Sequence, residues 1–198
     1  MKILNAYNER HIAEAAETLR DGGVVVFPTD TIYALGVDAR NHRAIERLCR
    51  IKGIDPAEQQ LSLLCADLSQ AAEYVRIDNA AFRTLRHYLP GPFTFVLPAA
   101  LRLPKSFKNR RTIGLRVPDC DAARALAEAS GGPLLCGSAA VDDPDELAEP
   151  ESIAMHYASQ ADVLLDGGTG GTVGSTIVDL SDSSSPEVLR EGISEFEG

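Results

Sequence analysis

The segment Thr29-Asp30-Thr31-Ile32-Tyr33 brings two hydroxyls, a carboxylate and a phenol close together. It follows Val24–Phe27, four apolar residues that predict a fully buried strand, and Pro28 ends that strand because proline has no N–H for the sheet ladder. In open α/β sheets ligands bind at the carboxyl ends of strands, so these side chains are candidates for holding a polar ligand. A polar turn between a strand and a helix is the other interpretation of the same residues.

Arg116 lies inside the apolar run Thr112–Val117, which predicts a strand that Pro118 ends. An arginine buried in a strand is rare unless it is paired. Arg116 therefore either pairs with an internal carboxylate or faces a cleft that takes an anion, and both alternatives are open. Arg190 is the only basic residue after Arg124, so it is either a partner in a surface ion pair or a single charge directed at a bound anion.

The segment from Gly167 to Thr176 is the most glycine-rich of the chain. Glycines let backbone N–H groups approach phosphate oxygens, but no lysine follows the last glycine, so this is not a Walker A loop. A strand is expected to follow it, which argues against a dinucleotide-binding fingerprint. A long flexible turn is the alternative. Ser138 offers one more hydroxyl, after the predicted strand Leu134–Cys136.

No G-x-S-x-G elbow is present, and no nucleophile is paired with a base in the sequence. An enzyme built from these residues is expected to work by holding its reactants rather than by covalent catalysis, so no catalytic nucleophile is assigned.

The charge of the chain argues against general binding of nucleic acid. The formal net charge is −10, and phosphate neutralisation by basic residues supplies most non-specific affinity for nucleic acid. A local basic patch is formed by Arg102, Lys105, Lys108, Arg110 and Arg111. This run is either an RNA-binding patch or a solvated loop.

Hydrophobic periodicity and capping signals predict the elements that must position these residues. Helices are expected over 8–20, 41–51, 67–75, 78–88, 121–129 and 153–159. Strands are expected over 24–27, 61–65, 93–97, 112–117, 134–136, 163–165, 175–180 and 188–189. Because several strands follow one another without a helix between them, the pattern predicts an α/β fold with a mixed sheet. The length of 198 residues suits a single domain over 1–198.

Composition narrows the class of protein further. The four cysteines stand singly, without C-x-x-C spacing, so we expect buried thiols in a reducing compartment and no metal site: Cys49, Cys65, Cys120 and Cys136. The apolar runs are far shorter than the roughly 20 residues of a membrane span, and Met1–Asn5 has no apolar signal region. We therefore expect a soluble, cytoplasmic protein without membrane contact.

Taken in order, several of these segments resemble the YrdC-like family. The matching segments are Phe27–Gly36, Ile51–Gly53, Pro90–Thr94, Thr112–Pro118, Gly137–Ala139, Gly174–Val178 and Leu189–Gly192. They span nearly the whole chain, and together they are specific although each is modest alone. The stretch Leu61–Asn79 is more similar to the YciO branch than to the YrdC branch. The resemblance implies a twisted α/β sheet with flanking helices and a concave, ligand-binding face.

The resemblance also implies a reaction. L-threonine and bicarbonate form a carbamate, which attacks the α-phosphate of ATP, and pyrophosphate leaves. The product, L-threonylcarbamoyladenylate, serves the modification of adenosine 37 in tRNA. ATP is thus a substrate, and Mg²⁺ normally accompanies the nucleotide. In-line attack at phosphorus needs positioning and charge stabilisation more than a protein nucleophile.

Site residues follow from the match to the family's motifs. The residues implied on the threonine side are Thr31, Arg116 and Ser175, with Arg116 at the carboxylate or carbamate and Ser175 where the two ligands meet. The residues implied on the nucleotide side are Lys52, Thr112, Ser138 and Arg190. The basic residues Lys105, Lys108, Arg110 and Arg111 are the candidates for the double-stranded RNA binding that has been linked to the family.

The sequence departs from the family pattern at two positions on the nucleotide side. Ile54 replaces the second base of the family's Lys-x-Arg, and Ala140 replaces the asparagine of its Ser-x-Asn. Losing both groups would cost roughly 2–5 kcal/mol of ligand or transition-state stabilisation. The resemblance therefore implies a threonylcarbamoyl-AMP synthase or a weakened relative. The alternative is a YciO-type protein that binds a nucleotide or double-stranded RNA without efficient synthesis.

Overall fold

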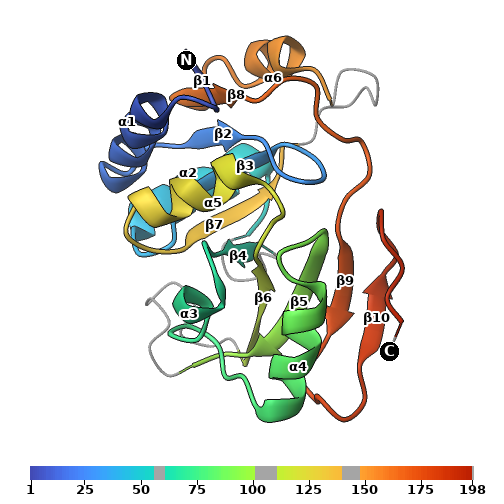
Figure 1. Ribbon diagram of the computed structural model, residues 1–198. Coiled ribbons are helices and arrows are strands. Elements are labelled where there is room, and N and C mark those ends of the chain that lie inside the picture. Colours follow the sequence, from blue (N-terminus) through green and yellow to red (C-terminus); the bar gives the residue numbers. More distant parts are fainter. Residues whose placement is uncertain (56–60, 101–110, 140–147, 198) are drawn as a thin grey trace.

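The computed structural model of this chain describes residues 1–55, 61–100, 111–139 and 148–197. These residues form one ten-stranded sheet with helices on both sides (Figure 1). In chain order the elements are β1 (Lys2–Asn5), α1 (Glu9–Arg20), β2 (Val25–Phe27), β3 (Ala34–Asp38), α2 (His42–Lys52), β4 (Ser62–Leu64), α3 (Leu68–Ala71), α4 (Asn79–Tyr88), β5 (Phe93–Pro98), β6 (Thr112–Arg116), α5 (Asp121–Ala129), β7 (Leu134–Ser138), α6 (Pro150–His156), β8 (Val163–Asp166), β9 (Thr176–Asp179) and β10 (Glu187–Arg190).

The sheet is mixed, twisted and unclosed, which confirms the predicted fold class. Its strand order is β1-β8-β2-β3-β7-β4-β6-β5-β9-β10, with β1 and β10 at the two edges. The pairs β1–β8, β2–β8, β4–β6 and β5–β9 are parallel, and the remaining pairs are antiparallel. Strands from the two ends of the chain therefore form the two edges of the sheet, and strands from its middle lie between them.

Polar side chains cap the helices where the sequence predicts their starts. Asn8 accepts a hydrogen bond from the backbone N–H of Arg10, and Asn41 accepts one from Ala44. Asp78 accepts from two N–H groups at the start of α4. These caps satisfy donors that have no partner within the helix, and they fix the helix starts within one residue of the predictions.

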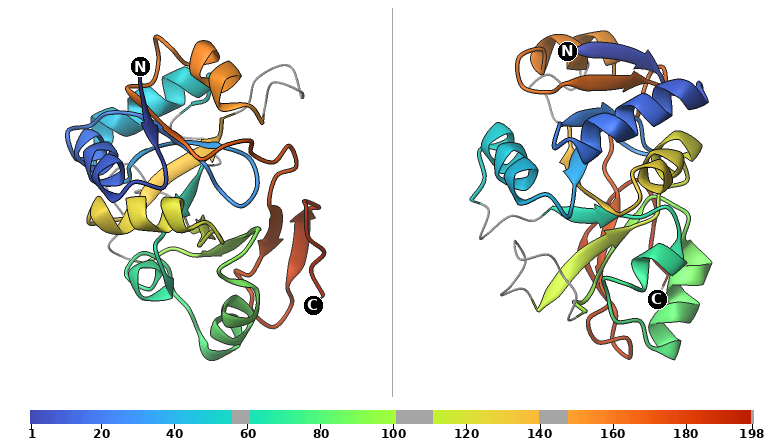
Figure 2. Two further views of the ribbon diagram at one scale, coloured as in Figure 1. Left: turned by 45° about the horizontal axis from the view of Figure 1, so that its top comes forward. Right: turned by 90° about the vertical axis from the view of Figure 1, so that its left-hand side faces the viewer.

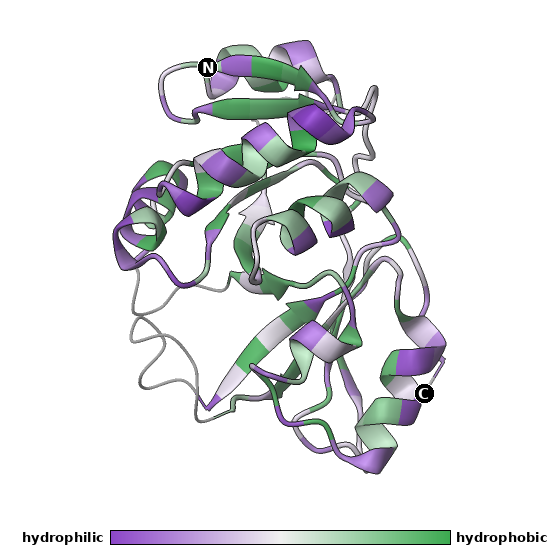
Figure 3. Ribbon diagram, turned by 60° about the vertical axis from the view of Figure 1, so that its left-hand side comes forward, coloured by the Kyte–Doolittle hydropathy of each residue, from purple (hydrophilic) through white to green (hydrophobic). Residues whose placement is uncertain are grey.

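Helices cover both sides of the sheet and define two hydrophobic clusters. Buried residues of α2, α4 and α6 belong to the larger cluster, and buried residues of α1 and α5 belong to the smaller one. Figure 2 shows α2 on one side of the sheet and α1 and α5 on the opposite side. In Figure 3 the strands are mostly hydrophobic, while polar residues gather on the outward sides of the helices. Helix burial thus anchors the sheet from both sides.

Two strands were not expected from the sequence. β1 lies at a sheet edge and buries only one of its four residues. An edge strand that buries so little needs no long apolar run, so the sequence gives no strong signal for it. β3 pairs with β2 and β7 in antiparallel fashion, so the segment after Phe27 is a loop between two strands and not a turn into a helix. The predicted helix over 67–75 shortens to α3, Leu68–Ala71. None of the described helices is long and apolar enough to span a bilayer.

Candidate functional site

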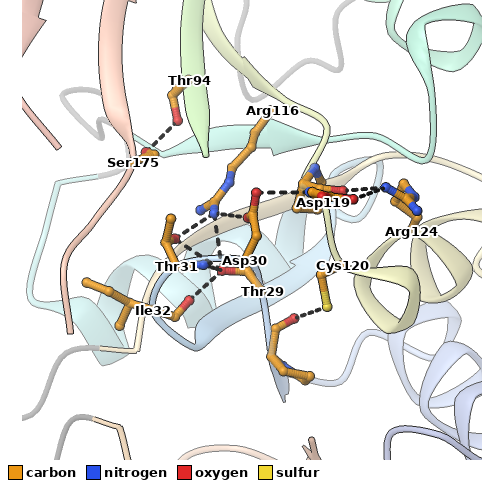
Figure 4. Close-up of polar contacts among 12 residues, drawn as sticks. Thr29, Asp30, Thr31, Ile32, Thr94, Arg116, Asp119, Cys120, Arg124 and Ser175 are labelled. Carbon is orange, nitrogen blue, oxygen red and sulfur yellow. Dashed lines mark hydrogen bonds and ion pairs between the residues drawn. The ribbon is translucent and has the colours of Figure 1, made fainter. Parts of the chain in front are cut away.

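The loop from Pro28 to Tyr33 carries the polar residues of the opening motif and joins β2 to β3. The Thr29 hydroxyl donates to the carbonyl of Ile32 at 2.7 Å and accepts from the N–H of Thr31 at 3.1 Å. A hydroxyl that bonds to nearby backbone in this way replaces the hydrogen bonds of a regular turn. The loop is thereby fixed with Asp30 and Thr31 directed toward β6 (Figure 4).

Arg116, the last residue of β6, meets this loop. Its Nη2 donates to Asp30 Oδ1 at 2.6 Å and to Thr31 Oγ1 at 2.6 Å, with Thr29 Oγ1 at 3.2 Å. Only 11% of the Arg116 side chain and 9% of the Asp30 side chain is exposed. Of the two alternatives for Arg116, pairing with an internal carboxylate is confirmed. The second alternative stays open, and the buried Nε of Arg116 has no hydrogen-bond partner among the described residues.

The sheet next to Arg116 has a side that the helices α1 and α5 only partly cover. Register places Arg116 beside Leu64, and Gly114 beside Ser62, on the same side as the smaller hydrophobic cluster. Leu64 is buried there, but Ser62, Thr112 and Gly114 are only half-buried. A Cβ on Gly114 would lie 2.7 Å from Ser62 Oγ, so a larger residue at this position would collide with Ser62. The candidate ligand-binding face, called the candidate face below, is this half-buried strip of Ser62, Thr112 and Gly114 next to Arg116.

Ser175 lies at one border of this face. Its hydroxyl is 2.9 Å from that of Thr94 on β5, and both residues are only 5% exposed. Figure 4 shows this pair near the Arg116 side chain. The Nη2 of Arg190 donates to the Ser175 carbonyl at 2.7 Å. The structure therefore brings Ser175 and Arg190 together, and Arg190 forms no ion pair within the described part of the chain.

Lys52 and Ser138 come together at another border of the face. The Nζ of Lys52, the last residue of α2, donates to the Ser138 carbonyl at 2.7 Å. Burial lowers the pKa of the Lys52 ammonium below its ordinary value. Burial raises the pKa of the Cys136 thiol to about 11, while the positive charges of Arg116 and Lys52 lower it. Both basic side chains are thus close enough to act on one buried thiol.

Of the other predicted site residues, some lie in the described part of the chain and some lie outside it. Thr112 is half-buried on the candidate face, in register with Pro98 of β5. Arg111 is exposed just before β6. Lys105, Lys108 and Arg110 lie outside the described residues, as does Ala140. The described residues contain no group of three or more His, Cys, Asp or Glu placed to hold a metal ion.

The glycine-rich segment supports the loop and does not present free N–H groups for phosphate at its first glycines. The N–H of Gly167 donates to the Tyr33 hydroxyl at 2.9 Å, and the N–H of Gly168 donates to Asp166 Oδ1 at 2.9 Å. The N–H of Gly171 donates to the Thr31 carbonyl at 2.8 Å. A Cβ on Gly171 would lie 2.4 Å from that carbonyl oxygen, so only glycine permits this close approach.

A separate pocket of about 470 Å³ adjoins the other side of the loop, at the carboxyl ends of β1, β2 and β8. Its lining includes Ala6, Tyr7, Pro28, Thr29, Cys120 and Gly167. It does not include Thr31 or Arg116. The candidate site is therefore defined by its converging polar groups and not by this volume.

Three contributors to the site were not assigned from the sequence. Asp30 stood in the opening motif without a role, and it pairs with Arg116. The backbone N–H of Asp119 donates to the second oxygen of Asp30 at 2.9 Å, a contact that no side-chain pattern reveals. The third contributor is Thr94. It is the last residue of the matching segment Pro90–Thr94, and this position was the only signal for it in the sequence.

Comparison with known proteins identifies relatives over nearly the full chain. The sequence pattern of the Sua5/YciO/YrdC family, described as "Telomere recombination", matches residues 17–192. The chain is 39% identical over 188 residues to the uncharacterized protein YciO of Escherichia coli K12, covering 93% of this chain and 90% of YciO. It is 34% identical to the threonylcarbamoyl-AMP synthase of Bacillus subtilis over 93% of this chain and 54% of that enzyme.

Solved structures agree with the sequence matches. The crystal structure of E. coli YciO superimposes with a TM-score of 0.84 at 36% identity, covering 98% of this chain and 95% of that one. The crystal structure of P. abyssi Sua5 complexed with L-threonine gives a TM-score of 0.86 at 29% identity, covering 97% of this chain and 58% of Sua5. The sequence, the fold and the converging polar groups agree, and the chain belongs to the Sua5/YciO/YrdC family.

Proposed function

We propose that this chain joins ATP, L-threonine and bicarbonate into L-threonylcarbamoyladenylate, as a synthase or a weakened relative of one, for modification of adenosine 37 in tRNA. The observation that carries the proposal is the contact of Arg116 Nη2 with Thr31 Oγ1 at 2.6 Å beside a half-buried sheet face. Synthases at 34–37% identity support it, as does a related structure that binds L-threonine.

The proposed ligand-binding roles are divided between the two borders of the candidate face. Arg116 and Thr31 hold the carboxylate or carbamate of threonine, and Ser175 stands where threonine and nucleotide meet. Four residues hold the nucleotide: Lys52, Thr112, Ser138 and Arg190. Pairing of Lys52 with Ser138, and of Arg190 with Ser175, supports this division, because each basic group is already held by a backbone carbonyl. Charges fixed before the ligand arrives need no reorganisation when negative charge develops on phosphorus.

No protein nucleophile enters the proposed reaction. A carbamate oxygen of the substrate attacks the α-phosphorus, the bond to pyrophosphate breaks, and the protein orients the two reactants in line. Mg²⁺ enters as a complex with the ATP phosphates, since the described residues offer no cluster of ligands for a resident ion. Lys52, with a lowered pKa, gains a favourable partner when phosphate approaches.

A second candidate function rests on Ile54. Where the family pattern has a base, Ile54 is half-buried and packs against the larger hydrophobic cluster. The nucleotide side therefore lacks one cationic contact, which favours a protein that binds nucleotide without efficient synthesis. Ala140, the other departure, lies outside the described residues.

Pyrophosphate release decides between the two functions. The full chain is incubated with Mg·ATP and bicarbonate, with and without L-threonine, and ATP binding is measured separately by calorimetry. Threonine-dependent release above the blank is the expected result for a synthase. Absence of release from a chain that still binds ATP would overturn the synthase and leave the nucleotide-binding function.

Double-stranded RNA binding is the remaining part of the alternative. Arg111 is exposed, and the net charge of −10 opposes contact with phosphates elsewhere. If the basic patch binds RNA, reversing the charges of Lys105, Lys108, Arg110 and Arg111 abolishes a gel shift with double-stranded RNA. A gel shift that persists in this variant excludes the patch as the binding site.

A further inference from the structure

Asp30 connects three parts of the candidate site through one carboxylate. Its Oδ1 accepts from Arg116 Nη2 at 2.6 Å, and its Oδ2 accepts from the backbone N–H of Asp119 at 2.9 Å. The loop before β3, the end of β6 and the turn before α5 are thereby tied together (Figure 4). With 9% of its side chain exposed, Asp30 makes these contacts largely out of water.

The hydrogen bonds of Arg116 are distributed unevenly over its guanidinium. Nη2 carries two N–H bonds, yet three oxygens lie within 3.2 Å of it, those of Thr29, Asp30 and Thr31. Nε carries one N–H, is buried and has no partner in the part of the chain that the structure describes. The guanidinium is thus held firmly by one nitrogen, while a second nitrogen lacks the oxygen that a buried donor requires.

An anion can approach Arg116 only through the 11% of its side chain that is exposed. A carboxylate or carbamate presents two acceptor oxygens, which match the fork of an arginine. Asp30 is not free to leave and make room, because both of its oxygens are bonded and its release would leave a buried carboxylate unpaired. The incoming anion therefore joins Asp30 at Arg116 and does not replace it.

We propose that Asp30 is a positioning residue for the anion-binding arginine: it holds Nη2 of Arg116 so that the rest of the guanidinium receives the carboxylate or carbamate of the amino-acid substrate. This inference rests on the proposed function, since it specifies how the threonine side binds its ligand. On this proposal the ion pair of Asp30 and Arg116 persists when the ligand is bound. The turn before α5 contributes to Asp30 through the backbone N–H of Asp119.

Calorimetry on the full chain tests the ligand part of this proposal. Asp30→Ala lowers L-threonine affinity by about tenfold or more, whereas ATP affinity stays within about twofold. Asp30→Asn keeps one acceptor for Arg116 and gives a smaller loss. Asp121→Asn, at the first residue of α5 and with 97% of its side chain exposed, is the matched control and leaves both affinities unchanged. Equal losses of ATP and L-threonine affinity in Asp30→Asn, or unchanged L-threonine affinity in Asp30→Ala, would overturn the proposal.

A ligand-free readout separates this proposal from the proposed function. The Nε–H proton of Arg116, assigned by NMR from its absence in Arg116→Lys, exchanges slowly in the wild-type chain because it is buried. Exchange in Asp30→Asn is about tenfold faster or more, since Nη2 has lost its charged partner. Unchanged exchange overturns the positioning role. A wild-type chain that binds neither ligand disproves the proposed function, and the exchange rates still decide the role of Asp30.

Discussion

At the scale of single residues, the chemistry of the site depends on pairs that are distant in sequence. Arg116 was expected to need either a carboxylate or an anion, and its carboxylate is Asp30, 86 positions away. The sequence identified Arg116 because charge inside an apolar strand is unusual. It did not identify Asp30 as the partner, because which of the 29 acidic residues lies nearest depends on the sheet register.

Ile54→Arg restores the second base of the family pattern and is expected to raise synthesis. The long arginine stem can cover the apolar surface that Ile54 covers, while its guanidinium reaches the nucleotide. A charge-assisted bond to phosphate contributes about 1.5–3 kcal/mol, so pyrophosphate release at subsaturating ATP should increase by about tenfold or more. Ile54→Leu is the control for size. Equal rates in the two variants would show that the nucleotide does not pass this position.

At the scale of elements, the loop after β2 is held by the glycine-rich segment after β8. The Tyr33 ring is fully buried, and its hydroxyl donates to the carbonyl of Gly168 at 2.7 Å while accepting from Gly167. Gly171 bonds to the Thr31 carbonyl on the same side. The segment that suggested a phosphate loop thus supports the loop that carries Thr31 by bonding to it.

Tyr33 is expected to make the stability of the chain depend on alkaline pH. Burial raises the pKa of Tyr33 from 10.0 to about 12. The folded state therefore retains the phenol proton more tightly, and the contribution of Tyr33 is complete below pH 10 and is lost as the pH rises toward 12. Between pH 9.5 and 11.5 the difference in unfolding free energy between wild type and Tyr33→Phe should fall by about 2 kcal/mol. Urea denaturation at each pH measures it, and a constant difference would refute the burial argument.

Helices and strands with strong local signals were predictable, whereas β1 and β3 were not. Asn8 and Asn41 marked helix starts because a cap depends on local sequence. β1 is an edge strand with three exposed residues, so its pairing with β8 carries no local pattern. β3 is buried on both sides and contains Gly36, which weakens a strand signal. Both strands form because distant partners supply their hydrogen bonds.

At the scale of the whole molecule, one continuous sheet carries both borders of the candidate face. β3, β7, β4, β6, β5 and β9 are adjacent, and the predicted threonine-side and nucleotide-side residues lie on these strands or on elements next to them. Several of the matching segments enter these strands, such as Pro90–Thr94 at β5 and Gly174–Val178 at β9. All ten described strands belong to this one sheet, and a single domain over 1–198 stays a prediction.

Arg190 is the only lysine or arginine in residues 125–198, and it lies at the border of the candidate face that Ser175 marks. Arg190 ends β10 and donates to the Ser175 carbonyl. The N–H of Ile193 donates to the carbonyl of Gly174, the residue before Ser175. Phe196 packs against Tyr88, with ring centroids 4.9 Å apart, so the segment after β10 is anchored on α4. The last strand pair and its aromatic anchor thus position Arg190, a role that its isolation in sequence suggested but did not locate.

Titration of L-threonine into the wild-type chain and into Arg116→Lys, at one fixed ATP concentration, tests whether the face around Arg116 is the threonine site. Lysine keeps the charge beside Asp30 but lacks the planar fork that matches a carboxylate. We expect the wild type to bind L-threonine and Arg116→Lys to bind it about tenfold more weakly or worse, with ATP affinity retained. Equal L-threonine affinity in the two proteins would contradict it.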